Sequence, residues 1–177
     1  MTSKQAERAR LRAVRDAASA APLMVPTPFM ARLRPGLIVA SYWPVGSEAD
    51  PGPLARAAAN AGCALALPHV TDRVQPLRFL SWDGGETLAT GPFGLQQPRP
   101  DAPDITPDII LAPLVGFDRR GNRIGQGAGH YDRAFAAHPD AWRVGIALSV
   151  QEVPAIAADP WDVPLHAIVT EREWIET

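Results

Sequence analysis

Cysteine is scarce in this sequence of 177 residues, and both a large charge excess of one sign and long apolar runs are missing. The single cysteine, Cys63, excludes an intramolecular disulfide, and its apolar neighbours predict a buried, inert thiol. A formal net charge of −2 provides no basic field that would favour nucleic acid. Without a long apolar run or a basic-then-apolar leader, neither membrane insertion nor export is supported. We expect a cytoplasmic protein that has no nucleic-acid or membrane partner.

The composition is that of a folded domain. Hydrophobic residues make up 46% of the chain, which argues against disorder, and the length is sufficient for one domain with a full core. The 19 prolines are spread along the chain, so they mark loops and strand edges rather than a separate region. We predict a single domain over residues 1–177, either a monomer or a weak homodimer.

Apolar runs alternate with segments that are compatible with helix. The runs predict strands at 36–42, 63–67, 77–82, 108–112, 142–148 and 166–170, with Pro68 and Pro113 ending two of them and the last strand closing the sheet. Helices are predicted over 4–20, from the segment 50–53 through 61, and from 131 onward, with Ser3 and Asp50 as candidate caps. Residues 22–35 are read as a proline-broken connection, and 151–158 as a short helical or turn segment.

The order of these segments predicts the fold class. Strand, helix and strand across 36–67 indicate a right-handed parallel unit. We therefore predict an α/β fold with three layers, in which helices flank a largely parallel, Rossmann-like sheet. Ligand-binding loops are expected at the carboxyl ends of the strands.

Three glycines at alternate positions follow the 108–112 strand and precede a predicted helix. Gly125, Gly127 and Gly129 would let the backbone adopt positive φ and let an anion approach the N–H groups of the loop and of the helix start. Arg123 adds a full positive charge. The pattern is neither a Walker A nor a G-x-G-x-x-G motif, and glycines also serve plain tight turns, so the loop alone leaves both interpretations open.

Asp132 lies seven residues after the first of these glycines. A carboxylate beside a bound phosphate would repel it unless a hard cation lay between them, and Mg²⁺ prefers carboxylate and phosphate oxygens. The glycine loop, Arg123 and Asp132 together therefore predict binding of a nucleotide and a metal ion.

These residues resemble a known family. Residues 113–118, Gly121, 123–125, Gly127, Gly129, 131–133 and 159–171 are similar to the signature of 5-formyltetrahydrofolate cyclo-ligases, also called methenyltetrahydrofolate synthetases, and weaker similarity extends to the N-terminus. The resemblance implies ATP- and Mg²⁺-dependent cyclisation of 5-formyltetrahydrofolate to 5,10-methenyltetrahydrofolate, with release of ADP and phosphate. In-line phosphoryl transfer requires the protein mainly to position the reacting groups and to neutralise the charge of the phosphates. No protein nucleophile is therefore expected.

The resemblance also assigns the site. Arg123 is expected to act in catalysis, and Asp132 and Asp162 to hold Mg²⁺. The residues expected to bind ATP are Lys4, Arg8, Arg12, Arg123, Ile124, Gly125, Gln126, Gly127, Ala128, Gly129, His130 and Tyr131. Those expected to bind the folate are Trp43, Glu48, Gln126, Gly127, Ala128, Gly129 and His130, with Glu48 recognising the pterin.

Plainer interpretations compete at several of these positions. The cations at 4, 8 and 12 share a helix face, which in an anonymous helix is more often simply solvated. Trp43 could be a core residue and Glu48 a helix start. Asp162, which precedes Val-Pro, could be a turn residue.

The chain also departs from the family pattern. Arg8 replaces a lysine, Gln97 a glutamate, Gln126 an aromatic or basic residue, His130 a tyrosine and Trp161 a histidine. These departures favour one alternative, a diverged relative that binds folate or nucleotide without turning it over. Another is a different ATP-dependent kinase or ligase on the same scaffold.

Overall fold

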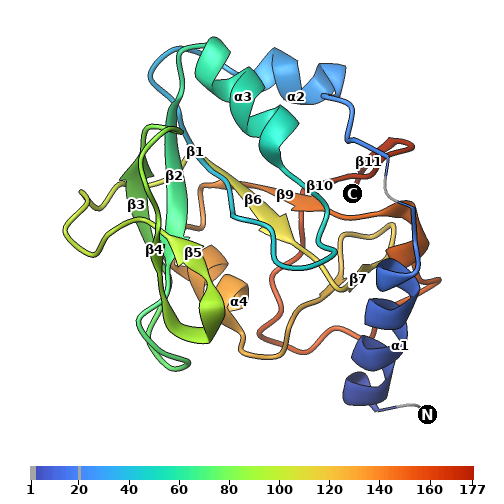
Figure 1. The fold of residues 1–177 in the computed structure, drawn as a ribbon. Coiled ribbons are helices and arrows are strands. Elements are labelled where there is room, and N and C mark those ends of the chain that lie inside the picture. Colours follow the sequence, from blue (N-terminus) through green and yellow to red (C-terminus); the bar gives the residue numbers. More distant parts are fainter. Residues whose placement is uncertain (1–2, 20) are drawn as a thin grey trace.

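A computed structural model describes residues 3–19 and 21–177. Its central feature is a seven-stranded sheet with the strand order β11-β10-β9-β6-β1-β2-β3 (Figure 1). These strands are β1 (Ile38–Ala40), β2 (Ala64–His69), β3 (Arg78–Trp82), β6 (Ile109–Pro113), β9 (Trp142–Ile146), β10 (Ala167–Val169) and β11 (Trp174–Glu176). The helices are α1 (Lys4–Asp16), α2 (Thr27–Arg32), α3 (Gly52–Asn60) and α4 (His130–Ala137), with 3-10 turns η1 (Pro92–Gly94) and η2 (Ser149–Gln151). Two small ribbons pair β4 (Ala89–Thr90) with β5 (Gln96–Gln97) and β7 (Gly116–Phe117) with β8 (Arg123–Ile124).

The centre of the sheet is parallel, as predicted. β10, β9, β6, β1 and β2 run in the same direction, and only the edge strands β11 and β3 are antiparallel to their neighbours. The α3 helix connects β1 to the parallel β2, which gives the expected strand–helix–strand unit. The carboxyl ends of the five parallel strands therefore lie at one edge of the sheet.

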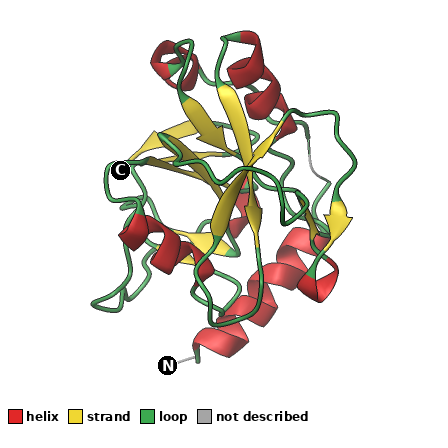
Figure 2. Cartoon of the chain, turned by 90° about the vertical axis from the view of Figure 1, so that its left-hand side faces the viewer, coloured by secondary structure: helices red, strands yellow, loops and turns green. Residues whose placement is uncertain are grey.

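Helices cover both faces of the sheet, so the three-layer prediction is confirmed (Figure 2). Strand residues alternate between two hydrophobic clusters, because successive side chains of a strand point to opposite faces. Val39 packs in the cluster that contains Phe29 of α2 and Leu54 of α3, whereas Ala40 packs in the cluster that contains Phe135 of α4. The α1 helix lies apart from both faces and inserts Leu11 into a third cluster beside the β7–β8 ribbon.

One of the two prolines that were expected to end strands does not do so. Pro68 lies inside β2, opposite Phe79 of β3, whereas Pro113, opposite Ile146 of β9, is the last residue of β6, which ends there as predicted. Both prolines lie beyond the last pairing with β1 at Ala40, so the missing N–H group removes no bond from that side of the sheet.

Several other boundaries differ from the sequence predictions. The α1 helix is capped by the Ser3 side chain, as expected, but it ends at Asp16, since the Ala18 N–H turns to the Arg15 carbonyl; Ala20 lies outside the described residues. Asp50 accepts the Gly52 N–H instead of capping α3, whose N-cap is Pro51. Strands β1, β9 and β10 are shorter than predicted.

Three further segments have a secondary structure that differs from the prediction. The connection at 22–35 contains α2, because its Pro28 stands in the first turn, where a helix tolerates proline. Strand β11 follows β10, so the predicted closing strand is not the last one. The 3-10 turn η2 ends at Gln151, where the predicted segment 151–158 was expected to begin.

Cys63 is buried, as expected. Within the described part of the chain, no helix has the length and apolar character needed to cross a membrane.

Candidate functional site

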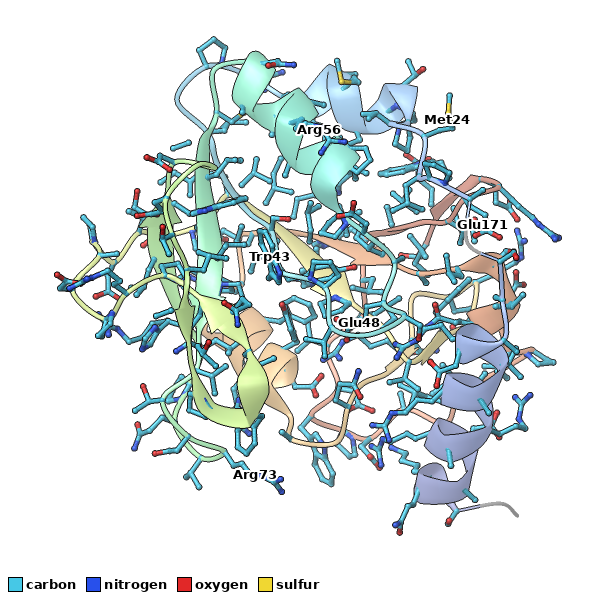
Figure 3. All side chains as sticks on the ribbon, in the orientation of Figure 1. Met24, Trp43, Glu48, Arg56, Arg73 and Glu171 are labelled. Atoms are coloured by element: carbon cyan, nitrogen blue, oxygen red, sulfur yellow. The ribbon has the colours of Figure 1, made fainter. Side chains whose placement is uncertain are left out.

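A cleft of about 980 Å³ lies where the loops after β1, β2, β6 and β9 meet α1 (Figure 3). This is the carboxyl edge of the parallel strands, where the sequence analysis placed the ligand loops. The residues that line the cleft include Lys4, Arg8, Arg15, Tyr42, Trp43, Val45, Ser47, Glu48, Arg73, Phe93, Arg123–Asp132, Asp159, Trp161 and Asp162. Every predicted site residue except Arg12 thus lines one cleft, and Arg12 donates to Gln126, which lines it.

The glycine loop has the conformation that its sequence requires. Gly127 and Gly129 have φ values of 110° and 68°, a region that residues with a side chain rarely adopt. Gly129 is the N-cap of α4, and among the described residues no side chain caps the N–H groups of this helix. The first turn of α4 therefore presents free donors and the positive end of the helix dipole to the cleft.

Arg123 lies under this loop and is held by Asp132. Only 6% of the Arg123 side chain is exposed, its guanidinium forms an ion pair with the Asp132 carboxylate, and its Cζ atom lies 5.1 Å from the centre of the Phe135 ring. The buried Nε atom has no partner within the described residues. A buried cation with an unused donor favours an anionic ligand at this position.

The cations of α1 contact other loops, so the solvated-face interpretation is wrong. Lys4 forms an ion pair with Asp159, and Arg8 Nε donates to the Gly125 carbonyl at 2.9 Å. Arg12 Nη2 donates to Gln126 Oε1 at 2.6 Å. These bonds attach α1 to both sides of the predicted phosphate site.

The same helix face continues to Arg15, which the sequence analysis did not include in the site. Arg15 Nε donates to Ser47 Oγ at 2.9 Å, and its buried Nη1 has no partner within the described residues. The spacing of 4, 8, 12 and 15 on one helix face was the signal that could have identified it.

Gln126 bridges the two predicted half-sites. Its Oε1 atom accepts from Arg12, while its Nε2 atom donates to Glu48 Oε1 at 3.0 Å. The second oxygen of Glu48 accepts the Val45 N–H at 3.0 Å. Burial raises the pKa of Glu48, and the bonds from Val45 and Gln126, with the charges of Arg15 and Arg12, partly oppose that rise.

Aromatic rings line the cleft around Glu48. Trp43 is 45% exposed and meets Trp82 edge to face, with 6.2 Å between ring centres, so the core interpretation of Trp43 is wrong. Glu48 does not begin a helix, since α3 starts at Gly52. Burial, together with the neighbouring Glu48 carboxylate, raises the pKa of Tyr42 and Tyr131. An apolar wall beside a carboxylate is suited to a flat, N–H-bearing heterocycle.

The two predicted metal ligands both line the cleft. Asp132 is paired with Arg123, and Asp162 accepts the Asp159 N–H at 2.7 Å, which agrees with the turn interpretation of Asp162. Lys4 Nζ lies 3.9 Å from Asp162. Within residues 3–19 and 21–177, no group of three or more His, Cys, Asp or Glu is arranged to hold a metal by itself.

The departures from the family pattern have distinct surroundings. Gln97 is buried, where its Oε1 accepts the Val70 N–H at 2.9 Å and its Nε2 donates to the Val70 carbonyl at 3.2 Å. An amide can make both bonds, whereas an ionised carboxylate can only accept, so Gln97 fixes the loop after β2. His130 begins α4, and burial, followed by the Arg133 charge, lowers its pKa. Trp161 is 69% exposed at the rim.

Comparison with known proteins identifies the family. A profile described as the 5-formyltetrahydrofolate cyclo-ligase family matches residues 1–171. The chain belongs to the 5-formyltetrahydrofolate cyclo-ligase family. A cyclo-ligase of Escherichia coli strain K12 is 32% identical over 146 residues, which cover 77% of this chain and 80% of the relative. A cyclo-ligase of Mycolicibacterium smegmatis is 32% identical over 149 residues, which cover 79% and 76%.

The similarity to this family is also seen when the whole fold is compared with solved structures. The Aquifex aeolicus 5,10-methenyltetrahydrofolate synthetase superposes with a TM-score of 0.66 at 26% identity, and the match covers 99% of this chain and 84% of that one. The structure of the Mycoplasma pneumoniae synthetase shares the fold, with a TM-score of 0.67 at 21% identity. The predicted family and the predicted fold class are therefore confirmed.

Proposed function

We propose that the protein catalyses ATP-dependent cyclisation of 5-formyltetrahydrofolate to 5,10-methenyltetrahydrofolate, releasing ADP and phosphate. Family membership supports a cyclo-ligase. The single structural observation that carries the proposal is one cleft with two chemically different halves. One half has aromatic walls around Glu48, and the other has the glycine loop with Arg8 and Arg123.

The Glu48 half is suited to the pterin ring. Val45 and Gln126 each donate to a different oxygen of the carboxylate, which fixes its orientation. Each carboxylate oxygen has more than one lone pair, so Glu48 can still accept two N–H donors from the pterin edge. Trp43 would cover a face of the ring.

The glycine-loop half is suited to the phosphates of ATP. The free N–H groups at the start of α4 and the guanidinium of Arg123 converge there, and the α1 cations lie beside them. Such fixed donors stabilise the charge that develops on a phosphoryl group during transfer, at little cost in reorganisation. We assign Arg123 to this role because its buried Nε has no other partner among the described residues.

Asp132 and Asp162 are suited to Mg²⁺ that is bound together with ATP. Both present carboxylate oxygens to the same cleft, and Mg²⁺ is usually held by one or two carboxylates while phosphates and water complete its shell. When bound, the ion would neutralise phosphate charge. The chain's own contribution is to keep Asp132 against Arg123 and Asp162 in its turn.

The chemistry requires no nucleophile from the protein. The formyl oxygen attacks the γ-phosphorus, forming a new O–P bond while the bond between that phosphorus and the bridging oxygen of ADP breaks. N10 then attacks the formyl carbon and loses its proton, and the phosphorylated oxygen leaves as inorganic phosphate. The protein has to hold N5, N10 and the γ-phosphate in reach and exclude water, which the two-sided cleft supports.

The direct test is absorbance in the methenyl-folate band with purified protein, 5-formyltetrahydrofolate and Mg²⁺, with and without ATP. We expect the band to grow only with ATP. Binding of either ligand by calorimetry without growth of the band would instead identify a non-catalytic relative. Phosphate release with another acceptor, but none with 5-formyltetrahydrofolate, would identify a different ligase or kinase.

A further inference from the structure

The end of the cleft farthest from α1 contains a cation that the proposed chemistry does not use. Arg73, in the loop after β2, lies on the opposite side of the cleft from α1 (Figure 3). Its Cζ atom is 4.9 Å from the centre of the Phe93 ring. Within the part of the chain that the structure describes, Arg73 is in no ion pair. An exposed guanidinium without a carboxylate, held on an aromatic face, is free to bind an anion.

Phe93 has an unusual conformation at this position. Its φ of 61° makes it the one positive-φ residue other than glycine among those the structure describes. The left-handed region costs a bulky residue free energy, and such strain is concentrated at ligand sites. Its ring is also 58% exposed and lines the cleft. The strained backbone thus holds an apolar ring in solvent beside Arg73.

The loop that carries Arg73 is held in place by neighbours on two sides. Arg133 Nη2 donates to the Arg73 carbonyl at 3.1 Å, and Gln97 binds both polar backbone groups of Val70. The nearest acid in sequence, Asp72, accepts the N–H groups of Val74 and Gln75 through Oδ1. The loop is therefore positioned by the protein, while the Arg73 guanidinium is left available.

We propose that Arg73 and Phe93 form a subsite for the tail of the folate, with Phe93 against the benzoyl ring and Arg73 against the glutamate carboxylates. The inference rests on the proposed function. A ligand that places its pterin at Glu48 and its N5 side toward the glycine loop must extend its remaining length toward another part of the cleft. The same cleft contains an aromatic ring and a cation in contact with each other, Phe93 and Arg73, which are the two groups that a benzoyl ring followed by carboxylates requires.

The test uses reduced 5-formyl-pteroyl substrates that have no glutamate, one glutamate and three glutamates. KM for each is measured by methenyl absorbance at saturating ATP, in the wild type and in the variants Arg73→Ala and Phe93→Ala. Arg56→Ala is the matched control, because Arg56 is an exposed arginine on α3 at the other end of the sheet (Figure 3).

In the wild type, we expect KM to fall about 10-fold when the first glutamate is added, the size expected for a hydrogen-bonded charge pair. Arg73→Ala should remove most of this decrease and leave the tail-free substrate, kcat and the KM for ATP unchanged. Phe93→Ala should raise KM for all three substrates, since they share the benzoyl ring. Arg56→Ala should reproduce the wild-type series.

Two results would overturn the subsite. One is a rise in KM that is equal with and without the tail in Arg73→Ala, which would mean that Arg73 only shapes the cleft. The other is an unchanged series in Arg73→Ala. Absence of methenyl product from every substrate in the wild type would instead refute the proposed function, so the two failures are distinguishable.

Discussion

Two carboxylates, Asp118 in the β7–β8 hairpin and Glu48 in the loop after β1, show how differently this protein treats the same chemical group. Asp118 is completely buried and accepts the backbone N–H groups of Arg120, Asn122 and Ile156, together with the Asn122 side chain. Glu48 is half-buried and accepts one N–H from Val45 and one from Gln126.

The directions of their pKa shifts express this difference. Burial acts to raise the pKa of Asp118, but its hydrogen bonds outweigh burial and lower it. For Glu48, burial prevails and the pKa is raised. A carboxylate whose acceptors are all used fixes the fold, whereas one with unused acceptors on a cleft wall is available for a ligand. The following variants test that distinction, with Asp132 as a second carboxylate of the cleft.

Asp132→Asn should have the largest effect, a loss of kcat on the order of 100-fold, which is typical when one preorganised electrostatic group is removed from a phosphoryl or acyl transfer site. The amide keeps the shape of the side chain but loses the charge that pairs with Arg123 and would hold Mg²⁺. Methenyl absorbance measures kcat, and circular dichroism checks the fold. The exposed Asp140→Asn is the control, and full turnover in Asp132→Asn would refute the assignment.

Asp118→Asn should reduce stability rather than turnover. One of its carboxylate oxygens becomes an NH₂ group that faces N–H donors, so we expect a loss of about 2 kcal/mol and a melting temperature lower by about 4–8 °C. At a temperature where the variant is folded, kcat should equal that of the wild type. A large kcat defect without a change in melting temperature would place Asp118 in the active site instead.

The same variant gives a pH test of stability. The pKa of Asp118 is lower in the folded protein than in the unfolded chain, so its contribution is fully present above the unfolded value of about 3.9 and is lost as the pH falls through the folded value. The wild type should therefore lose stability in this acid range more steeply than Asp118→Asn, as measured by denaturant unfolding at each pH. Parallel profiles would contradict the lowered pKa.

Glu48→Gln should raise KM for 5-formyltetrahydrofolate about 10-fold and change KM for ATP little, because its new NH₂ group would face the donors of the pterin edge. Initial rates with one substrate varied and the other saturating separate the two constants. Glu86→Gln, which changes an exposed glutamate outside the cleft, is the control. Equal effects on both substrates would argue against a pterin-specific role.

Gln126→Met should have the smallest effect, a decrease of about 3-fold in kcat/KM for the folate at neutral pH, as expected for one net hydrogen bond. The variant removes a bond that lowers the pKa of Glu48, so the acid-side fall of kcat/KM should begin at a higher pH than in the wild type. The pH profile measures this shift, with the exposed Gln5→Met as control. An unshifted profile would mean that Gln126 does not act through Glu48.

Local sequence patterns predicted much of the molecule because they reflect local physical chemistry. Ser3 was identified as a helix cap, and the capping bond is present. The strand that became β6 was recognisable from its apolar, β-branched residues. Gly125, Gly127 and Gly129 predicted a loop with positive φ, which Gly127 and Gly129 adopt. The predictions failed where the end of a strand depends on a neighbouring strand. Pro68 did not end β2, because β1 has already ended at Ala40 and pairs with β2 only as far as Ala66.

The sequence by itself determined the fold class, the family and the region of the ligand loops, because periodicity, glycine placement and signature residues are properties of short segments. Only the tertiary structure decided which distant residues contact each other: Gln126 joins Arg12 to Glu48, Gln97 anchors the loop after β2, and Arg73 packs on the ring of Phe93. These contacts depend on which loops lie next to one another at the carboxyl edge of the sheet. The packing of the whole chain determines which loops are neighbours there, and no local sequence pattern encodes it.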